Sequence, residues 1–171
     1  LLSKKLNKTY EKDDRIHIVD IGLDYRNDKL SFNIPREGHP HGSFSTSLFS
    51  SNSHCEYIQT TTIDNLIYEL ELEFIDLIKL DLEGFDHYAL LGARQSLAEN
   101  KIKIIQFEVT RCWEDASNSP CSTFRLLRNA NFDIYWLSKD KLIPINDISN
   151  LTHFSLYSNF IAIHNNLDIV I

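Results

Sequence analysis

Residues 75–84 read IDLIKLDLEG and constrain the fold more than any other part of the chain. The first six of these residues are mostly apolar, which is typical of a strand that is covered on both faces. Asp81 and Glu83 follow at once, in a turn that ends in glycine. Because ligands of open α/β sheets bind beyond the carboxyl ends of the strands, this turn is the first candidate for a functional site.

Strands alternate with helices along the rest of the chain. Apolar residues at helical spacing predict helices over residues 63–70 and 84–99, and Ser119-Pro120 is a strong helix start. Short apolar and β-branched runs predict strands at residues 16–19, 29–34, 57–60, 75–80, 102–109, 132–137, 141–145 and 159–164. This order predicts an α/β fold with a mostly parallel sheet. The last three runs have no helix between them, which predicts antiparallel pairing at one edge.

The composition excludes several classes of protein. The 171 residues suit a single domain over residues 1–171, and 17 basic against 24 acidic side chains give a net charge of −7. This acidic balance argues against nucleic acid or an anionic membrane surface as the main partner. Cys55, Cys112 and Cys121 have irregular spacing that forms neither a disulfide framework nor a metal site. We therefore expect no metal and a reducing, cytoplasmic compartment.

A third carboxylate, Glu108, ends the next apolar run after the glycine turn. If the two runs are neighbouring parallel strands, their ends lie about 5 Å apart. Asp81, Glu83 and Glu108 would then converge on one crevice, where carboxylates can bind hydroxyl or ammonium groups, hold a metal or act as a general base. The alternative is that Asp81 and Glu83 only stabilise the start of the following helix, and the two roles are compatible.

Two other segments invite a functional interpretation. Gly22 closes a strand-like run, but no second glycine follows it, so a strand leading into a hairpin fits better than a nucleotide-binding loop. Residues 35–54 form a loop long enough to suggest a function. Its His39 and His41 flank a proline, which is poor spacing for metal ligands, and they either contact a substrate or belong to a plain loop.

The order of these motifs resembles the FkbM-type methyltransferase family. The resemblance is carried by IDLIKLDLEG, by ALLGA at residues 89–93 and by IIQFE at residues 104–108. Upstream, TTIDNL, IGLD and KLSF resemble the family's helix start and hairpin. The resemblance covers residues 16–110 and implies a class I methyltransferase (Rossmann-like) sheet with an antiparallel C-terminal hairpin strand. It also implies S-adenosylmethionine as the cofactor and O-methylation of a sugar or small natural product that carries a hydroxyl.

The resemblance also implies roles for individual residues. Asp81 would be the catalytic base or orienting acid, with Glu83 as its neighbour. Glu108 would contact the substrate, and His39 and His41 would cover it from the long loop.

The cofactor side of the family pattern is only partly found in these 171 residues. Gly22, Leu23 and Asp81 are the expected cofactor-binding residues, whereas a glycine-rich D-x-G-A-N-x-G loop is not found. The sequence has no methionine and begins at Leu1. We therefore expect the C-terminal two-thirds of the family's domain, with the cofactor-loop strands before residue 1 and one side of the IDLIKLD strand left open. The alternative is a non-catalytic α/β interaction or substrate-binding module that keeps the carboxylate crevice.

Overall fold

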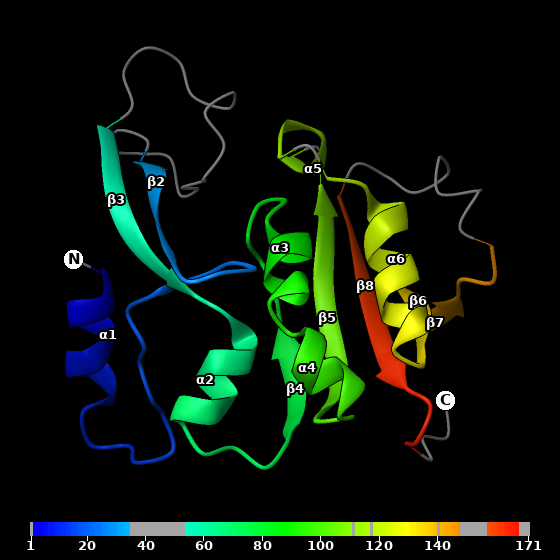
Figure 1. Ribbon diagram of the computed structural model, residues 1–171, viewed down its shortest axis with the longest axis horizontal. Helices are drawn as coiled ribbons and strands as arrows, with labels where there is room; N and C mark the ends of the chain where they lie inside the picture. Colours follow the sequence, from blue (N-terminus) through cyan, green and yellow to red (C-terminus); the bar gives the residue numbers. More distant parts are fainter. Residues whose placement is uncertain are drawn as a thin grey trace.

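A computed structural model of the chain describes residues 2–34, 54–110, 112–116, 118–139, 141–147 and 157–167 (Figure 1). Most of the predicted loop over residues 35–54, with His39 and His41, lies outside these described residues.

The first part of the chain forms a small sheet beside one helix. Its elements are α1 (Leu2–Tyr10), β1 (Gly22–Leu23), β2 (Asp28–Ile34) and β3 (His54–Thr61). The strand order is β1-β3-β2, in which β3 is parallel to β1 and antiparallel to β2. The sheet confirms the strands predicted at residues 29–34 and 57–60.

The strand predicted over residues 16–19 is wrong, because this segment has no regular secondary structure. Ile16 and Val19 are 38% and 47% exposed, so their side chains are not packed as those of a central strand would be. A β-branched run favours extended backbone, but a strand also needs a neighbour to complete its hydrogen bonds.

A second sheet has five strands in the order β4-β5-β8-β6-β7. These strands are β4 (Ile75–Lys79), β5 (Ile102–Thr110), β6 (Phe132–Ser138), β7 (Lys141–Pro144) and β8 (Tyr157–His164). β4 and β5 are adjacent and parallel, as predicted, with Ile75 opposite Ile102 and Lys79 opposite Gln106.

The prediction of a mostly parallel sheet is wrong. The pairs β5–β8, β8–β6 and β6–β7 are all antiparallel, so β4–β5 is the one parallel pair of the larger sheet among the residues that the structure describes. The physical reason is the position of β8, which lies between β5 and β6 and runs opposite to both. The antiparallel pairing expected near the end of the chain is confirmed, but it extends inward to β5.

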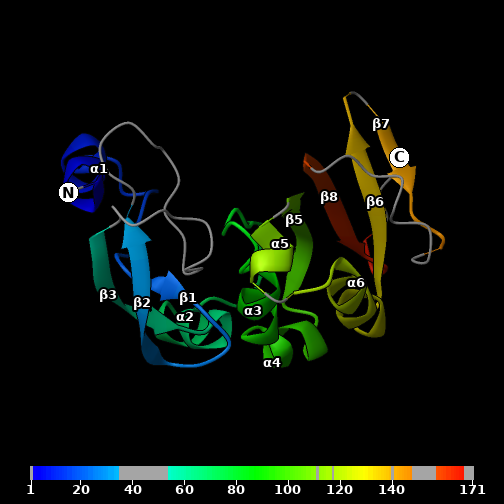
Figure 2. The same ribbon diagram turned by 90° about the horizontal axis from the view of Figure 1, so that it is seen from above.

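Helices cover one face of the larger sheet. The helices of this half of the chain are α2 (Ile63–Glu69), α3 (Asp86–Leu91), α4 (Arg94–Ala98), α5 (Cys112–Asp115) and α6 (Pro120–Asn129). Figures 1 and 2 both place α3, α4 and α6 on the same side of the strands. None of the helices in the described part of the chain has the length and apolar character of a membrane span.

The helix predicted over residues 84–99 is instead two short helices that meet at Gly92. A Cβ atom at Gly92 would lie 2.3 Å from the backbone oxygen of Asp24, so the chain from β1 packs directly on this glycine. The predicted start of α2 is confirmed, since the Asn65 N–H donates to Oγ1 of Thr62 at 3.0 Å.

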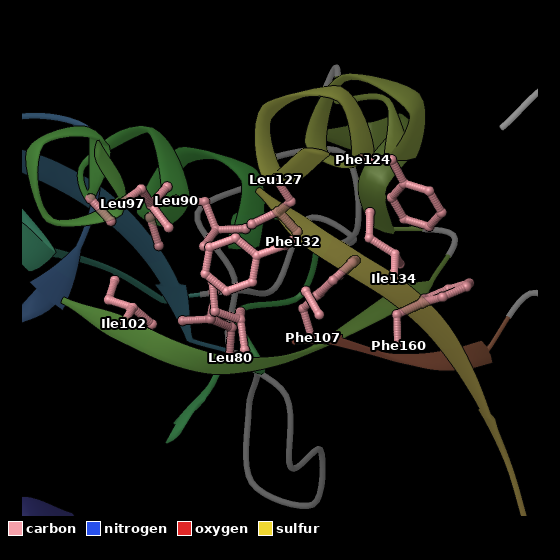
Figure 3. Close-up of a cluster of buried hydrophobic side chains, with 14 of the residues drawn as sticks. Leu80, Leu90, Leu97, Ile102, Phe107, Phe124, Leu127, Phe132, Ile134 and Phe160 are labelled. Carbon is pink, nitrogen blue, oxygen red and sulfur yellow. The ribbon is translucent and has the colours of Figure 1, made fainter. Parts of the chain in front are cut away.

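The core lies between these helices and the larger sheet (Figure 3). Phe107 of β5 is fully buried, and its ring contacts those of Phe124 at 5.8 Å, Phe160 at 5.6 Å and Trp113 at 6.4 Å between centroids. Phe124 and Phe160 also meet edge to face at 5.1 Å. This aromatic cluster joins β5, β8, α5 and α6, and so fixes the end of β5 relative to its surroundings.

β4 forms one edge of the larger sheet within the described residues, as expected from the sequence. Leu77, in the middle of β4, is 54% exposed although the strand is apolar. An exposed apolar edge strand can pair with the edge of another molecule.

The ring cluster predicts a large loss of stability when Phe160 is shortened. Phe160→Ala removes a 1%-exposed side chain and should lower the free energy of unfolding by about 3–5 kcal/mol. Tyr157→Ala on the same strand removes a 70%-exposed ring and should change it by about 0.5 kcal/mol or less. Urea unfolding of both variants makes the measurement, and similar losses in the two would contradict this account of the core.

The edge position of β4 predicts self-association through Leu77. Leu77→Lys places a charge on the open edge and should raise the protein concentration at which light scattering detects aggregates. Leu72→Lys is the matched control, because it makes the same change at an exposed leucine just before the strand. Equal effects of the two substitutions would show that general charge, rather than the edge, controls solubility.

Candidate functional site

Three carboxylates come together where β4 and β5 end. Asp81 and Glu83 follow β4, and Glu108 lies near the carboxyl end of β5. The pairing of Lys79 with Gln106 brings the two strand ends level, and the Leu80 N–H extends it by donating to the Gln106 oxygen at 2.8 Å. The structure therefore brings together the three acidic residues that the sequence placed in one crevice.

Glu108 has a raised pKa. Burial raises its pKa above the ordinary value, and the nearby negative charges of Asp81 and Glu83 raise it further. A hydrogen bond from Asn159 and the positive charge of Lys79 act in the opposite direction. The net effect makes Glu108 hold a proton more readily than an exposed glutamate does.

Asn159 is a site residue that the sequence did not indicate. It stands opposite Glu108 in the β5–β8 pairing, and its Nδ2 donates to Oε1 of Glu108 at 3.4 Å. Gln106 holds the amide in turn, because its Nε2 donates to Oδ1 of Asn159 at 3.2 Å. This arrangement depends on strand pairing between distant segments, for which a single sequence carries no local signal.

Asp81 is more exposed than Glu108. Its Oδ2 pairs with Nζ of Lys79 at 3.0 Å, and both side chains are about half exposed, at 54% and 55%. An exposed ion pair of this kind adds little to stability. It leaves Asp81 about half exposed, so a ligand in solution can reach its carboxylate.

The turn between β4 and α3 is tightly constrained. Glu83 and Gly84 both have left-handed backbone angles, with φ of 50° and 93°. A Cβ atom at Gly84 would lie 2.4 Å from the backbone oxygen of Cys112, at the start of α5, so only glycine fits there. Sγ of Cys112 also donates to Oε2 of Glu83 at 3.4 Å, and Nδ2 of Asn118 donates to the Gly84 oxygen at 2.8 Å.

The helix-cap alternative for Asp81 and Glu83 receives little support. The N-cap residue of α3 is Phe85, and no side-chain hydrogen bond caps the helix. The acidic pair therefore does not provide the hydrogen bond that a capping role would use.

Asp86 is a second residue whose importance the sequence did not reveal. It is 1% exposed, and neither carboxylate oxygen has a hydrogen-bond partner. Burial raises its pKa to about 6, the charge of Asp81 adds to that effect, and the backbone N–H groups of Asp86, Leu82 and Gly84 oppose it. An acidic residue in the first turn of a helix is common at the surface, so the sequence gives no sign of this burial.

The proposed cofactor residues Gly22 and Leu23 lie in β1, in the smaller sheet. Leu23 packs against the main core, and the chain then reaches Tyr25. The Tyr25 ring lies 5.6 Å from that of Tyr88, which lies 5.5 Å from that of Phe85 beside the carboxylate turn. A line of three aromatic rings thus connects the end of β1 with the site.

A cavity of about 580 Å³ lies between α2 and α4, away from the three carboxylates. Its Asp64 has a structural role, because its carboxylate accepts from the N–H groups of Gln95 at 3.0 Å and Ser96 at 2.8 Å. The Asp64 carboxylate thus stabilises the start of α4. Among the described side chains, no group of three or more His, Cys, Asp or Glu residues is arranged to hold a metal ion.

Comparison with known proteins agrees with the motifs around this site. The family model described as the methyltransferase FkbM domain matches residues 6–134, about three quarters of the chain. The match contains Asp81, Glu83 and Glu108 and ends before β8, which carries Asn159. No curated protein and no solved structure matches the chain.

The buried carboxyl group of Asp86 predicts a specific pH dependence of stability. Its pKa is about 6 in the folded protein against 3.8 ordinarily, so the folded state binds the proton more tightly than the unfolded chain does. The contribution of Asp86 to stability should therefore be greatest at low pH. It should fall by up to about 3 kcal/mol as the pH rises from 3.8 to 6, and stay constant above that.

Asp86→Asn isolates this contribution, because asparagine has nearly the same shape and does not titrate. We expect the difference in unfolding free energy between wild type and variant to change across this pH range in urea titrations. A difference that is constant from pH 4 to 7 would contradict the assigned pKa.

Proposed function

The chain belongs to the FkbM methyltransferase family, and from this membership we propose that it uses S-adenosylmethionine to methylate a hydroxyl of a sugar or another small natural product. The observation that carries the proposal is the convergence of Asp81 and Glu83 with Glu108, whose pKa is raised. Transfer to a hydroxyl requires a group that removes its proton, and a carboxylate with a raised pKa is suited to that task.

The residues of the site fit the proposed cofactor. S-adenosylmethionine, when bound, supplies a methyl group on a positively charged sulfur and also carries an ammonium group. Three carboxylates with one neighbouring lysine give the strand ends a negative potential, which favours such a cation. Gly22, Leu23 and Asp81 are the proposed cofactor contacts. Tyr25, beside β1, is 43% exposed, and the planar base of the cofactor can stack on its ring.

We divide the catalytic roles by electrostatics. A carboxylate oxygen of Glu108 would take the proton of the acceptor hydroxyl, and the bound cofactor would supply the methyl group. Asp81, which pairs with Lys79 at 3.0 Å, and Glu83 would orient that hydroxyl by hydrogen bonding. His39 and His41 of the long loop are proposed to cover the substrate.

The first experiment is calorimetric titration of S-adenosylmethionine into the protein. Turnover is then measured as S-adenosylhomocysteine formed with a panel of sugars and phenols. Cofactor binding with acceptor-dependent turnover is the expected result for this protein. Failure of that protein to bind the cofactor would favour the alternative, a non-catalytic binding module.

Two substitutions should change the pH profile of turnover in different ways. Glu108→Gln should lower kcat by roughly 100-fold and abolish the rise of kcat with pH that follows loss of the Glu108 proton. Asp81→Asn should also lower kcat but keep that rise, moved to lower pH, because removing the charge of Asp81 lowers the pKa of Glu108.

Asp76→Asn is the matched control for these variants. Asp76 lies on β4 before the strand end and pairs with Lys103 at 2.7 Å, so its loss should leave the profile unchanged. Near-normal turnover in Glu108→Gln would remove Glu108 from the mechanism. A lost pH dependence in Asp81→Asn would instead make Asp81 the base.

A further inference from the structure

We propose that Asn159 and Gln106 are positioning residues, which hold Oε1 of Glu108 and so leave Oε2 as the oxygen that takes the proton of the acceptor hydroxyl. The catalytic meaning of this role rests on the proposed function, in which Glu108 is the base. The hydrogen bonds that orient the carboxylate can be measured without any activity, so the two proposals can fail separately.

The strands place these three side chains on one face of the larger sheet. Successive side chains of a strand point to opposite faces, so Gln106 and Glu108 both lie on the face away from Phe107. Phe107 is fully buried in the core beneath the helices. Asn159 stands directly opposite Glu108 in the antiparallel pair β5–β8, and opposite residues of such a pair share a face. The three polar side chains therefore lie together on the face opposite the helical layer.

The neighbouring strands direct the two amides toward each other. On β6, the residue opposite Asn159 is Leu137, which has no polar side-chain group. Gln106 has Ile161 opposite it on β8, and on β4 it has Lys79, which is engaged in an ion pair of its own. The two amides bond each other instead, with 3.2 Å between Nε2 of Gln106 and Oδ1 of Asn159.

The charge of Glu108 sets the direction of this chain of hydrogen bonds. An ionised carboxylate only accepts hydrogen bonds, so Asn159 has to turn its NH2 group toward it. Nδ2 of Asn159 accordingly donates to Oε1 of Glu108 at 3.4 Å. The amide oxygen of Asn159 then faces Gln106, whose NH2 group donates to it. Gln106 thereby keeps the Asn159 amide from turning over, because a flipped amide would place two NH2 groups against each other.

The bond to Oε1 distinguishes the two oxygens of Glu108. Within the residues that the structure describes, Asn159 donates to Oε1, and Oε2 accepts no hydrogen bond. Both bonds of the chain are partly buried, so water competes with them less than it does at the surface. A proton adds more readily to the oxygen that does not already accept a hydrogen bond. The acceptor proton is therefore expected on Oε2.

The charged groups around Glu108 do not replace this bond. Asp81 and Glu83, after β4, repel its negative charge, and Lys79 of β4 attracts it. Lys79 in turn pairs with Asp81 at 3.0 Å. From β8, the contribution comes from the neutral amide of Asn159. A charge at a distance acts on both oxygens of a carboxylate, whereas this hydrogen bond acts on one of them.

The first test is an NMR titration of the wild-type protein and needs no variant. The side-chain NH2 signals of Asn159 should shift with the same midpoint as the carboxyl carbon of Glu108, because a donor senses the charge of its acceptor. The side-chain NH2 signals of Gln106 should follow with a smaller amplitude. Asn159 signals that stay constant while Glu108 titrates would overturn the proposal.

The second test compares matched variants in the same titration. Asn159→Leu removes the donor but keeps the size of the side chain, and should move the Glu108 midpoint to higher pH by about half a pH unit. Gln106→Leu should move it in the same direction by less, because the Asn159 amide can then turn over. Gln95→Leu is the control, since it removes an amide that donates to Glu99 at 2.8 Å and should shift Glu99 alone. An unchanged Glu108 midpoint in Asn159→Leu would overturn the proposal.

The third test follows turnover against pH. Asn159→Leu should lower the highest kcat by about tenfold, because the Glu108 carboxylate is no longer held in one orientation, and should move the rise of kcat to higher pH. The KM for S-adenosylmethionine should change little, and Gln106→Leu should have the same effects to a smaller extent. If no methyl transfer is found, the proposed function fails, and the two NMR tests still decide how Glu108 is oriented. An unchanged kcat and pH profile in Asn159→Leu would overturn the positioning role.

Discussion

The parallel pairing of β4 with β5 is the constraint on which the rest of the site depends. Lys79 lies opposite Gln106, and the Leu80 N–H continues the pairing to the end of the strand. A shift of one residue in this register would turn Glu108 to the other face of the sheet. The buried ring of Phe107 resists that shift, because it packs among the rings of Phe124 and Phe160.

Negatively charged side chains lie close together at the site, and different neighbours offset the repulsion at each of them. Lys79 pairs with Asp81 through a half-exposed positive charge that water screens. Asn159 gives Glu108 a neutral donor, which stabilises the carboxylate without fixing its protonation state. Asp86 is buried without a hydrogen-bond partner and has a raised pKa, so these three neighbouring acids occupy three electrostatic environments. Separate environments are how similar carboxyl groups acquire separate chemical roles.

Local patterns in the sequence correctly predicted β4 and β5, the strands at whose ends Asp81, Glu83 and Glu108 lie. The apolar run before Asp81, the helical spacing of α2 and the proline start of α6 each depend on neighbours within a few residues. The position of β8 was not predictable in this way, and neither was the contact of Asn159 with Glu108, because both depend on pairing across about fifty residues. The burial of Asp86 and the break at Gly92 likewise arise from packing, which leaves no periodic signal.

The central position of β8 has a consequence for folding during synthesis. β5 and β6 leave the ribosome well before β8, yet they have no contact as neighbours until β8 inserts between them. The sheet is therefore completed by its last strand, and the unfinished edges of β5 and β6 are exposed to chaperones or to other nascent chains until then. The same insertion delivers Asn159, so the environment of Glu108 is completed in the final step of assembly.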